Sequence, residues 1–168
     1  MNGRFFWIFC LFGLFFMLFN VAGCSPPSTG SGFIRKELLE YKKAAVLPFK
    51  GDAKGEASDT FAKDFHEKFP QIELVRREQV WTALQPKDLY SDRIDEAARR
   101  RIGQALGVQA LIAGNVYYPS VLRWLLQIQV IDVETGEIMG RSLVEIDYAG
   151  AEGLKYGCKI AARNLAPR

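Results

Sequence analysis

An uncharged apolar stretch near the N-terminus sets the strongest limit on how this chain folds. Residues 5–19 contain no charged side chain, and they follow Arg4 and the free amine. A positive start followed by an apolar stretch of this length is typical of a signal peptide. A helix over these residues rises about 1.5 Å per residue and spans only about 22 Å, less than the hydrocarbon core of a bilayer. The folded domain is therefore expected in the residues that follow.

The apolar stretch ends in Val21, Ala22, Gly23 and Cys24. Two small residues before a cysteine fit the recognition site of the lipoprotein signal peptidase, although leucine is more usual where Val21 stands. This motif predicts removal of residues 1–23 and attachment of lipid to the Cys24 thiol, with no other cofactor. Acyl chains on Cys24 would make a membrane the first partner of the domain.

Two features bear on how and where the chain is anchored. Ser25 follows the cysteine where an aspartate would be found in retained lipoproteins, and by resemblance to sorted Gram-negative lipoproteins this favours the periplasmic face of the outer membrane. Extending the apolar stretch through residues 20–23 brings it near spanning length. An uncleaved signal anchor is therefore the alternative.

A chain that begins at Cys24 has 145 residues, the size of one domain. It carries 21 basic and 19 acidic side chains, because residues 1–23 hold one arginine and no acid. A net charge of +2 predicts no nucleic-acid partner. Cys10 leaves with the signal peptide and Cys24 is acylated, so Cys158 has no partner for a disulfide. We expect Cys158 to be a buried small residue on a C-terminal helix.

The residues after Cys24 divide into a linker and one domain. Residues 24–32 are rich in Ser, Pro and Gly and predict a flexible linker, which leaves 33–168 as the domain. Hydrophobic patterns predict a mixed sheet of about five strands, antiparallel at one end, with helices packed on it, in the α/β (α+β) class. The expected strands are 44–49, 72–76, 108–118, 124–133 and 138–148, and the expected helices are a short one within 34–43, then 58–69, 78–84, 92–106 with Asp92 as cap, and 151–165.

No catalytic or metal-binding pattern is visible in the sequence. His66 is the only histidine, and no second ligand type is near it. Gly51 and Gly55 superficially resemble a phosphate-binding loop, but Lys54 precedes the second glycine instead of following it. These observations predict neither an enzyme nor a nucleotide-binding protein.

Three consecutive arginines, residues 99–101, follow the start of the fourth expected helix. They are consistent with a contact to phosphate or a lipid headgroup. On a helix, however, two of three neighbouring side chains must point away from the core, so a solvated face is the favoured interpretation.

Several segments together resemble the CsgG-type superfamily of envelope lipoproteins. That superfamily includes the curli secretion channel subunit, the lipoprotein activator of penicillin-binding proteins and flagellar outer-membrane accessory lipoproteins, and the N-terminal domain of the translocation protein TolB is similar in fold. The resemblance implies a periplasmic α/β domain without enzymatic activity. The matching segments are Ala45–Phe49, Leu74–Arg77, Gln79–Leu84, Leu106–Val116 and Ile131–Ile138.

The chain departs from the curli channel subunit in one respect. That subunit adds long amphipathic hairpins that build a shared transmembrane barrel, and each of their strands needs about 9–11 alternating residues. Every segment of the present chain is already used by the minimal domain. We therefore expect it to form no pore by itself.

The favoured function is binding of another envelope protein, as scaffold or regulator. Aromatic and arginine side chains are the usual anchors of interfaces, so Tyr117, Tyr118, Arg123 and Trp124 are the candidate partner face. Simple packing of these four residues at the end of the sheet is the alternative. A second hypothesis, drawn from the resemblance alone, is self-association into a ring that supports secretion or appendage assembly.

Overall fold

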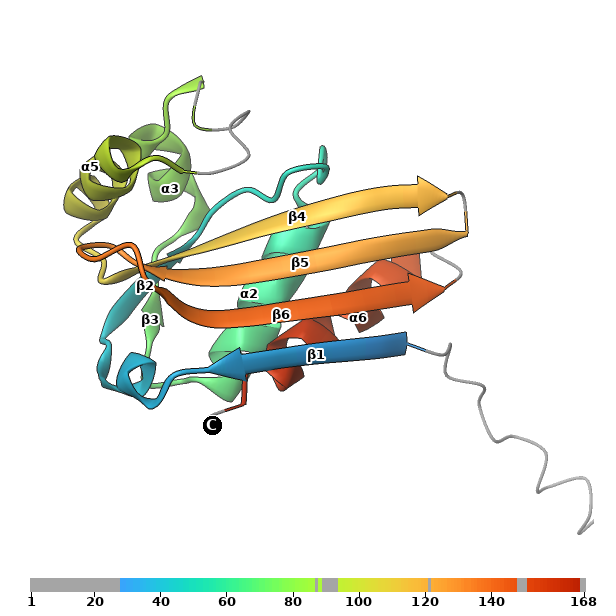
Figure 1. The fold of residues 1–168 in the computed structure, drawn as a ribbon. Coiled ribbons are helices and arrows are strands. Elements are labelled where there is room, and N and C mark those ends of the chain that lie inside the picture. Colours follow the sequence, from blue (N-terminus) through green and yellow to red (C-terminus); the bar gives the residue numbers. More distant parts are fainter. Residues whose placement is uncertain (1–27, 87, 89–93, 121, 148–150, 167–168) are drawn as a thin grey trace, which may run out of the picture.

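The computed structural model describes residues 28–86, 88, 94–120, 122–147 and 151–166. The predicted signal peptide and Cys24 lie outside this range. The described residues form one mixed sheet of six strands with helices packed on it, which confirms the expected α+β class (Figure 1). The strands are β1 Ser28–Ile34, β2 Lys43–Val46, β3 Glu73–Leu74, β4 Ala110–Ser120, β5 Arg123–Asp132 and β6 Ile138–Asp147. The helices are the 3₁₀ helix η1 Lys36–Glu40, α2 Glu56–Lys68, α3 Arg77–Ala83, α5 Glu96–Leu106 and α6 Ala151–Asn164.

The strand order is β1-β6-β5-β4-β2-β3. Four strands, β4, β5, β6 and β1, pair antiparallel, while β2 runs parallel to both β3 and β4. The predicted order of strands and helices is confirmed from β2 to α6. None of the described helices is both long and apolar enough to cross a membrane.

The sixth strand, β1, corrects the predicted linker. Ser28–Ile34 pairs along its whole length with β6, so the flexible linker predicted to reach Gly32 is wrong for residues 28–32. The glycines have a packing reason: a Cβ at Gly32 would lie 2.7 Å from the Asn164 backbone oxygen at the end of α6. Glycine permits this close approach. Only residues 25–27 therefore separate the predicted lipid site, Cys24, from the sheet.

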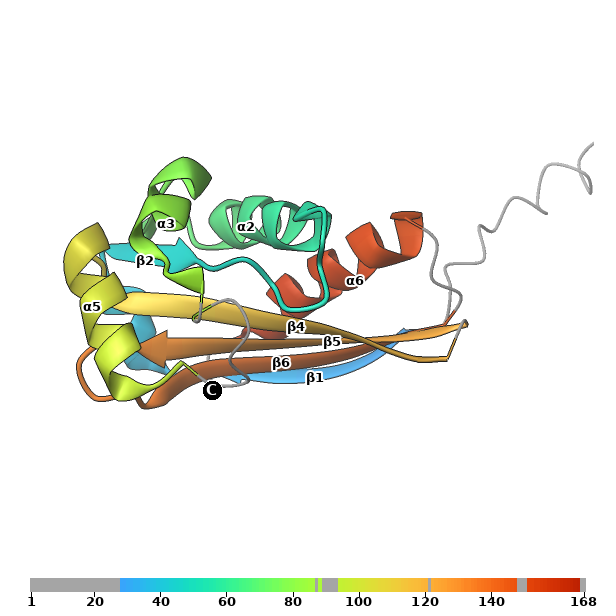
Figure 2. The same cartoon turned by 90° about the horizontal axis from the view of Figure 1, so that it is seen from above.

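The larger core lies between the sheet and the helices α2 and α6, which cover the same face (Figure 2). Phe61 and Phe65 of α2 are fully buried, and their rings lie 5.8 Å apart. Cys158 of α6 is also fully buried, which confirms its prediction. Burial raises the pKa of its thiol to about 12, so this cysteine is a poor nucleophile.

A smaller core lies at one end of the sheet, where α3 and α5 gather (Figure 2). Val80 of α3, Ile102 of α5 and Leu111 of β4 meet there. The near-continuous apolar run at 108–118 predicts a strand covered on both faces, and β4 is covered on both faces only in this first part. Farther along, Tyr117 is about half exposed, because no described helix extends over that end of the second face; Tyr118, on the other face, is also about half exposed.

Two local predictions differ from the structure. Asp95, not Asp92, caps α5, and its carboxylate accepts a 2.7 Å hydrogen bond from the Ala98 backbone; Asp92 lies outside the described residues. Regular alternation along the expected strand 138–148 predicts that Ile138 points inward with Val144 and Ile146, but Ile138 is 37% exposed. A register shift between Val130 and Ile131 places Met139 in the core in its stead.

Candidate functional site

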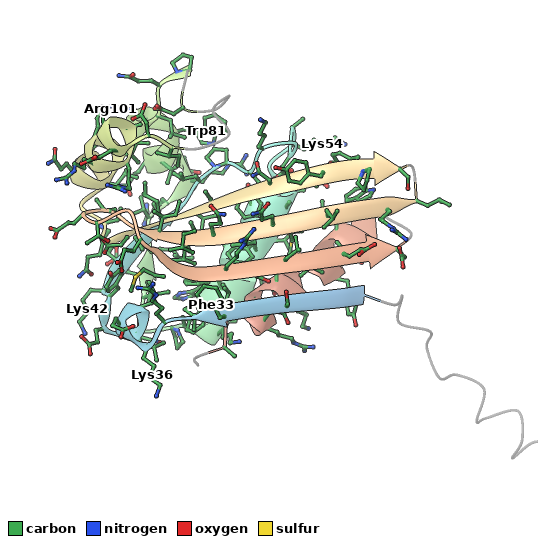
Figure 3. All side chains as sticks on the ribbon, in the orientation of Figure 1. Phe33, Lys36, Lys42, Lys54, Trp81 and Arg101 are labelled. Carbon is green, nitrogen blue, oxygen red and sulfur yellow. The ribbon has the colours of Figure 1, made fainter. Side chains whose placement is uncertain are left out.

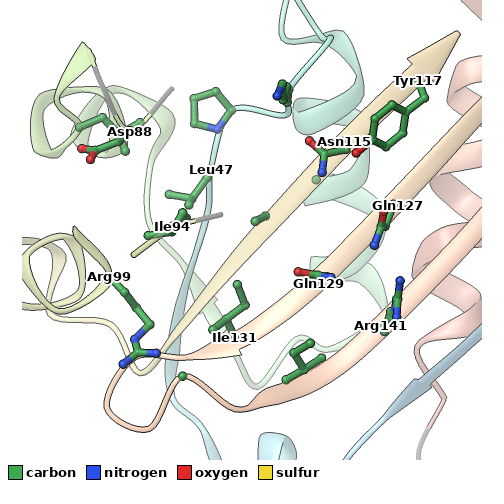
Figure 4. A pocket seen from close by; sticks show the side chains of 17 residues that line it. Leu47, Asp88, Ile94, Arg99, Asn115, Tyr117, Gln127, Gln129, Ile131 and Arg141 are labelled. Atoms are coloured by element: carbon green, nitrogen blue, oxygen red, sulfur yellow. The ribbon is translucent and has the colours of Figure 1, made fainter. Parts of the chain in front are cut away.

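A hollow of about 810 Å³ lies on the face of the sheet opposite α2 and α6 (Figure 4). Its floor is formed by β4, β5 and β6. One wall is the segment that follows β2, and the other comes from α5 and from residues between α3 and α5. The lining residues used below are Leu47, Asp88, Ile94, Arg99, Asn115, Tyr117, Gln127, Gln129, Ile131 and Arg141.

The floor of the hollow is polar because alternate residues of a strand point to opposite faces. Leu126 and Ile128 enter the core, so Gln127 and Gln129 must face the hollow. Asn115 stands opposite Gln127 in the register of β4 and β5. These amide side chains present donors and acceptors together and suit a partner's backbone or carboxylates.

Arg99 is the most buried basic residue of the hollow, with 9% exposure. Its Nη2 lies 3.4 Å from the Glu134 backbone oxygen, while its Nε has no hydrogen-bond partner among the described residues. Gly136 allows this position: it has a φ of 75°, and a Cβ there would collide with the guanidinium. Arg99 therefore lies against the turn before β6 mainly because the guanidinium fits beside Gly136, and it forms few hydrogen bonds there.

The hollow holds a second guanidinium that has no carboxylate partner among the described residues. Arg141 projects from β6, opposite Gln129, and is exposed. Within the described part of the chain, neither Arg99 nor Arg141 has an ion-pair partner. Asp88 also lines the hollow, but it pairs with Arg101 at 2.5 Å. Arg99 and Arg141 thus give the hollow positive charge that no carboxylate of the described residues neutralises.

The three arginines of α5 have three different environments, so the predicted solvated face describes Arg100 but not Arg99, which is buried. Only Arg100 points into solvent, where it pairs with Glu96 one turn earlier. Arg101 donates to Asp88 and, at 2.8 Å, to the Ala83 backbone oxygen, so it joins α5 to the end of α3 (Figure 3). Arg99 lies against the turn before β6, and Arg101 lies against the end of α3. Residue spacing along α5 does not reveal these neighbours.

The four residues predicted as a partner face lie at the end of the β4–β5 pair, on two faces of the sheet. Tyr118 and Trp124 stack edge to face with centroids 4.8 Å apart, and the Tyr118 hydroxyl donates to the Gly51 backbone oxygen at 3.0 Å. Burial, with a smaller contribution from a nearby aspartate, raises the pKa of Tyr118. Tyr117 lines the hollow on the opposite face, and on β5 Arg123 pairs with two carboxylates of β6.

The described residues contain no group of three or more His, Cys, Asp or Glu side chains placed to hold a metal ion. His66 is exposed on α2, away from the hollow. Sequence reasoning missed the hollow itself. The signal that could have found it is the pair of glutamines alternating with core residues on β5, which predicts a polar patch on the sheet but not the walls around it.

Comparison with known proteins gives structural matches only. No protein-family profile and no curated protein sequence matches the chain. The PelC dodecamer from Paraburkholderia phytofirmans superposes with a TM-score of 0.55 at 12% identity, over 84% of this chain and 99% of that one. The LpoB C-terminal domain from Salmonella enterica gives a TM-score of 0.50 at 19% identity, over 80% and 93%. Lipoprotein GNA1162 from Neisseria meningitidis gives 0.51 at 16% identity, over 65% and 82%.

These likenesses establish the fold. The chain has an envelope-lipoprotein-like fold, shared over most of its length with the LpoB domain and with GNA1162. At identities below 20%, side chains of the hollow cannot be carried over from one protein to another.

Proposed function

We propose that this protein is a non-enzymatic, lipid-anchored protein of the bacterial envelope, whose domain binds a segment of another envelope protein in the hollow over the open sheet face. The observation that carries the proposal is the hollow itself: about 810 Å³ of space with a polar floor and apolar ends. The envelope-lipoprotein-like fold supports the location, and the resemblance to the CsgG-type superfamily supports a binding role.

The charges of the hollow indicate the chemistry of the partner. Arg99 and Arg141 lack carboxylate partners in the described part of the chain, and Arg99 is largely withdrawn from water. A guanidinium in such a place gains from an incoming carboxylate, which it can bind through two parallel hydrogen bonds. The partner segment is therefore acidic, with apolar side chains that reach Leu47, Ile94 and Ile131 at one end.

Reversing the charge of Arg141 should weaken the binding of the partner in the hollow, and cross-linking from Gln129 can measure this effect. A photo-cross-linking residue at Gln129, on the floor, should form an adduct with a partner protein in intact cells. Arg141→Glu should lower the yield of that adduct about tenfold, because it places like charge against the acidic segment. Arg100→Glu is the matched control, since Arg100 is exposed on α5 and does not line the hollow. The readout is the adduct band on a denaturing gel.

Two outcomes would contradict the proposal. One is an adduct from Gln129 whose yield is the same in the Arg141→Glu variant and the parent. The other is cross-linking from Lys63, exposed on the outer side of α2, with none from Gln129. Either would move the partner surface away from the hollow.

Self-association is the second candidate function, and one observation favours it. The PelC chain with which this chain superposes over 84% of its length is part of a dodecamer. A heterologous contact that closes gives a ring of identical subunits. We expect sedimentation of the protein in mild detergent to give the mass of a closed oligomer if this candidate is correct. A monomer of 18.9 kDa or less, corrected for bound detergent, would exclude it in favour of the tethered binding protein.

A further inference from the structure

The start of β1 and the turn between β4 and β5 lie at the same end of the sheet (Figure 1). Ser28 pairs with Ile146, and Ile146 pairs with Trp124, so the three residues stand in one row across the sheet. Two strand spacings separate Ser28 from Trp124, about 10 Å. Leu122 lies two residues beyond Trp124 and therefore extends about 7 Å past this row.

The length of chain between the membrane attachment and the sheet is short. Four residue steps separate Cys24 from Ser28, and an extended chain spans at most about 14 Å over them. Both modes of attachment, by lipid on Cys24 or by an uncleaved signal anchor, end at or near Cys24. At this end of the sheet the β4–β5 turn extends farther than Ser28, so it is placed to meet a bilayer to which the chain before Ser28 is attached (Figure 1).

The side chains of this end suit a membrane interface. Leu122 is 61% exposed, Tyr118 52% and Tyr117 48%. Residues 117–120 and 122 carry no charge. Arg123, which follows Leu122 in the chain, is already paired with Glu145 and Asp147. Tyrosine and tryptophan are enriched where a bilayer meets water, because one part of each ring is apolar and another forms hydrogen bonds.

We propose that the β4–β5 turn rests in the headgroup region of the membrane, with Leu122 inserted and the Tyr118–Trp124 pair at the interface. The contact is apolar and aromatic, and it needs no anionic lipid. This inference rests on the membrane attachment in the proposed function, and it turns the opposite end of the sheet, with α3 and α5, away from the bilayer (Figures 1 and 2).

The chain offers two natural probes for this orientation. Trp124 belongs to the proposed contact, whereas Trp81 lies on α3, by the opposite end of the sheet (Figure 3). Trp81 is itself 42% exposed, so a lack of quenching at Trp81 would not result from burial of its side chain in the protein. Trp7, in the predicted signal peptide, is the remaining tryptophan and is replaced by phenylalanine in both probe proteins.

The experiment uses membrane-attached protein reconstituted in phosphatidylcholine vesicles whose chains carry bromine near the ester group. In the Trp81→Phe protein, which keeps Trp124, we expect about half of the fluorescence to be lost relative to unbrominated vesicles. In the Trp124→Phe protein, which keeps Trp81, we expect no loss. Adding Leu122→Glu to the first protein should restore its fluorescence, while Leu143→Glu, a matched change at a 39% exposed residue on the open face, should not. Raising the salt concentration should change none of these values.

The results separate the inference from the function on which it rests. Protein that stays out of the membrane fraction would overturn both the attachment and the orientation. Protein that is membrane-attached but shows equal quenching of Trp81 and Trp124, or none of Trp124, would overturn the orientation alone. Quenching of Trp124 that survives Leu122→Glu would also overturn the proposed insertion of the turn.

Discussion

Replacing Phe65 with alanine is expected to lower the free energy of unfolding by about 3–5 kcal/mol. Phe65 has no exposed surface, and its ring lies 5.8 Å from that of Phe61 and 4.8 Å from that of Phe69. It fills the space between α2 and the sheet, so alanine would leave a cavity that rigid strands cannot close. Since a domain of this size is stabilised by only about 5–15 kcal/mol, much of the protein would unfold in mild denaturant.

Urea denaturation followed by circular dichroism checks this expectation. His66→Ala on the same helix is the control, because His66 is exposed and its replacement should change the free energy of unfolding by less than about 0.5 kcal/mol. A loss below 1 kcal/mol for Phe65→Ala would mean that α2 is not packed as the structure shows.

The parts of the fold that sequence could predict are those in which one local pattern determines the answer. Phe61, Phe65 and Phe69 recur every four residues, and this spacing places them on one side of a helix whatever lies beneath it. Gln127 and Gln129 alternate with Leu126 and Ile128, and such alternation predicts both a strand and its two faces. Such patterns also predicted the burial of Cys158.

The parts that sequence could not predict depend on distant neighbours. Residues 28–32 have the composition of a linker, yet they form a strand because β6 supplies hydrogen bonds and α6 requires glycine beside it. Arg99 is buried because a turn more than thirty residues away closes over it. Ile138 is exposed because a bulge shifts the register, and no pattern within β6 marks that bulge.

The candidate site shows the same division. The aromatic and arginine residues at 117–124 could be recognised from the sequence as types that are common in interfaces. The sequence did not reveal that Tyr118 and Trp124 lie on one face of the sheet and Tyr117 on the other. The hollow has a floor from β4, β5 and β6, and its walls come from α5, from the segment after β2 and from residues between α3 and α5. The two ends of the sheet thus acquire different roles in our proposals, one toward the membrane and one toward a protein.

Cys24→Ala is expected to abolish the incorporation of labelled palmitate completely, because Cys24 is the only cysteine in the predicted lipoprotein processing motif. Cys158→Ala is the matched control and should keep full labelling. Cys158 has no exposed surface, and its thiol pKa is raised to about 12 by burial, so it is protonated at neutral pH and out of reach of an acyl donor. Labelled protein on a denaturing gel, divided by total protein, is the measurement.

If the parent protein took up no label, the proposed lipid on Cys24 would be wrong. The mass of the protein would then have to be measured. If its mass then included residues 1–23, the uncleaved anchor would hold the domain instead, and an apolar helix would replace the acyl chains. The length of chain that follows Cys24 would be unchanged, since three residues still separate it from Ser28. The palmitate experiment thus decides how the domain is attached, and tryptophan quenching decides which end of the domain faces the membrane.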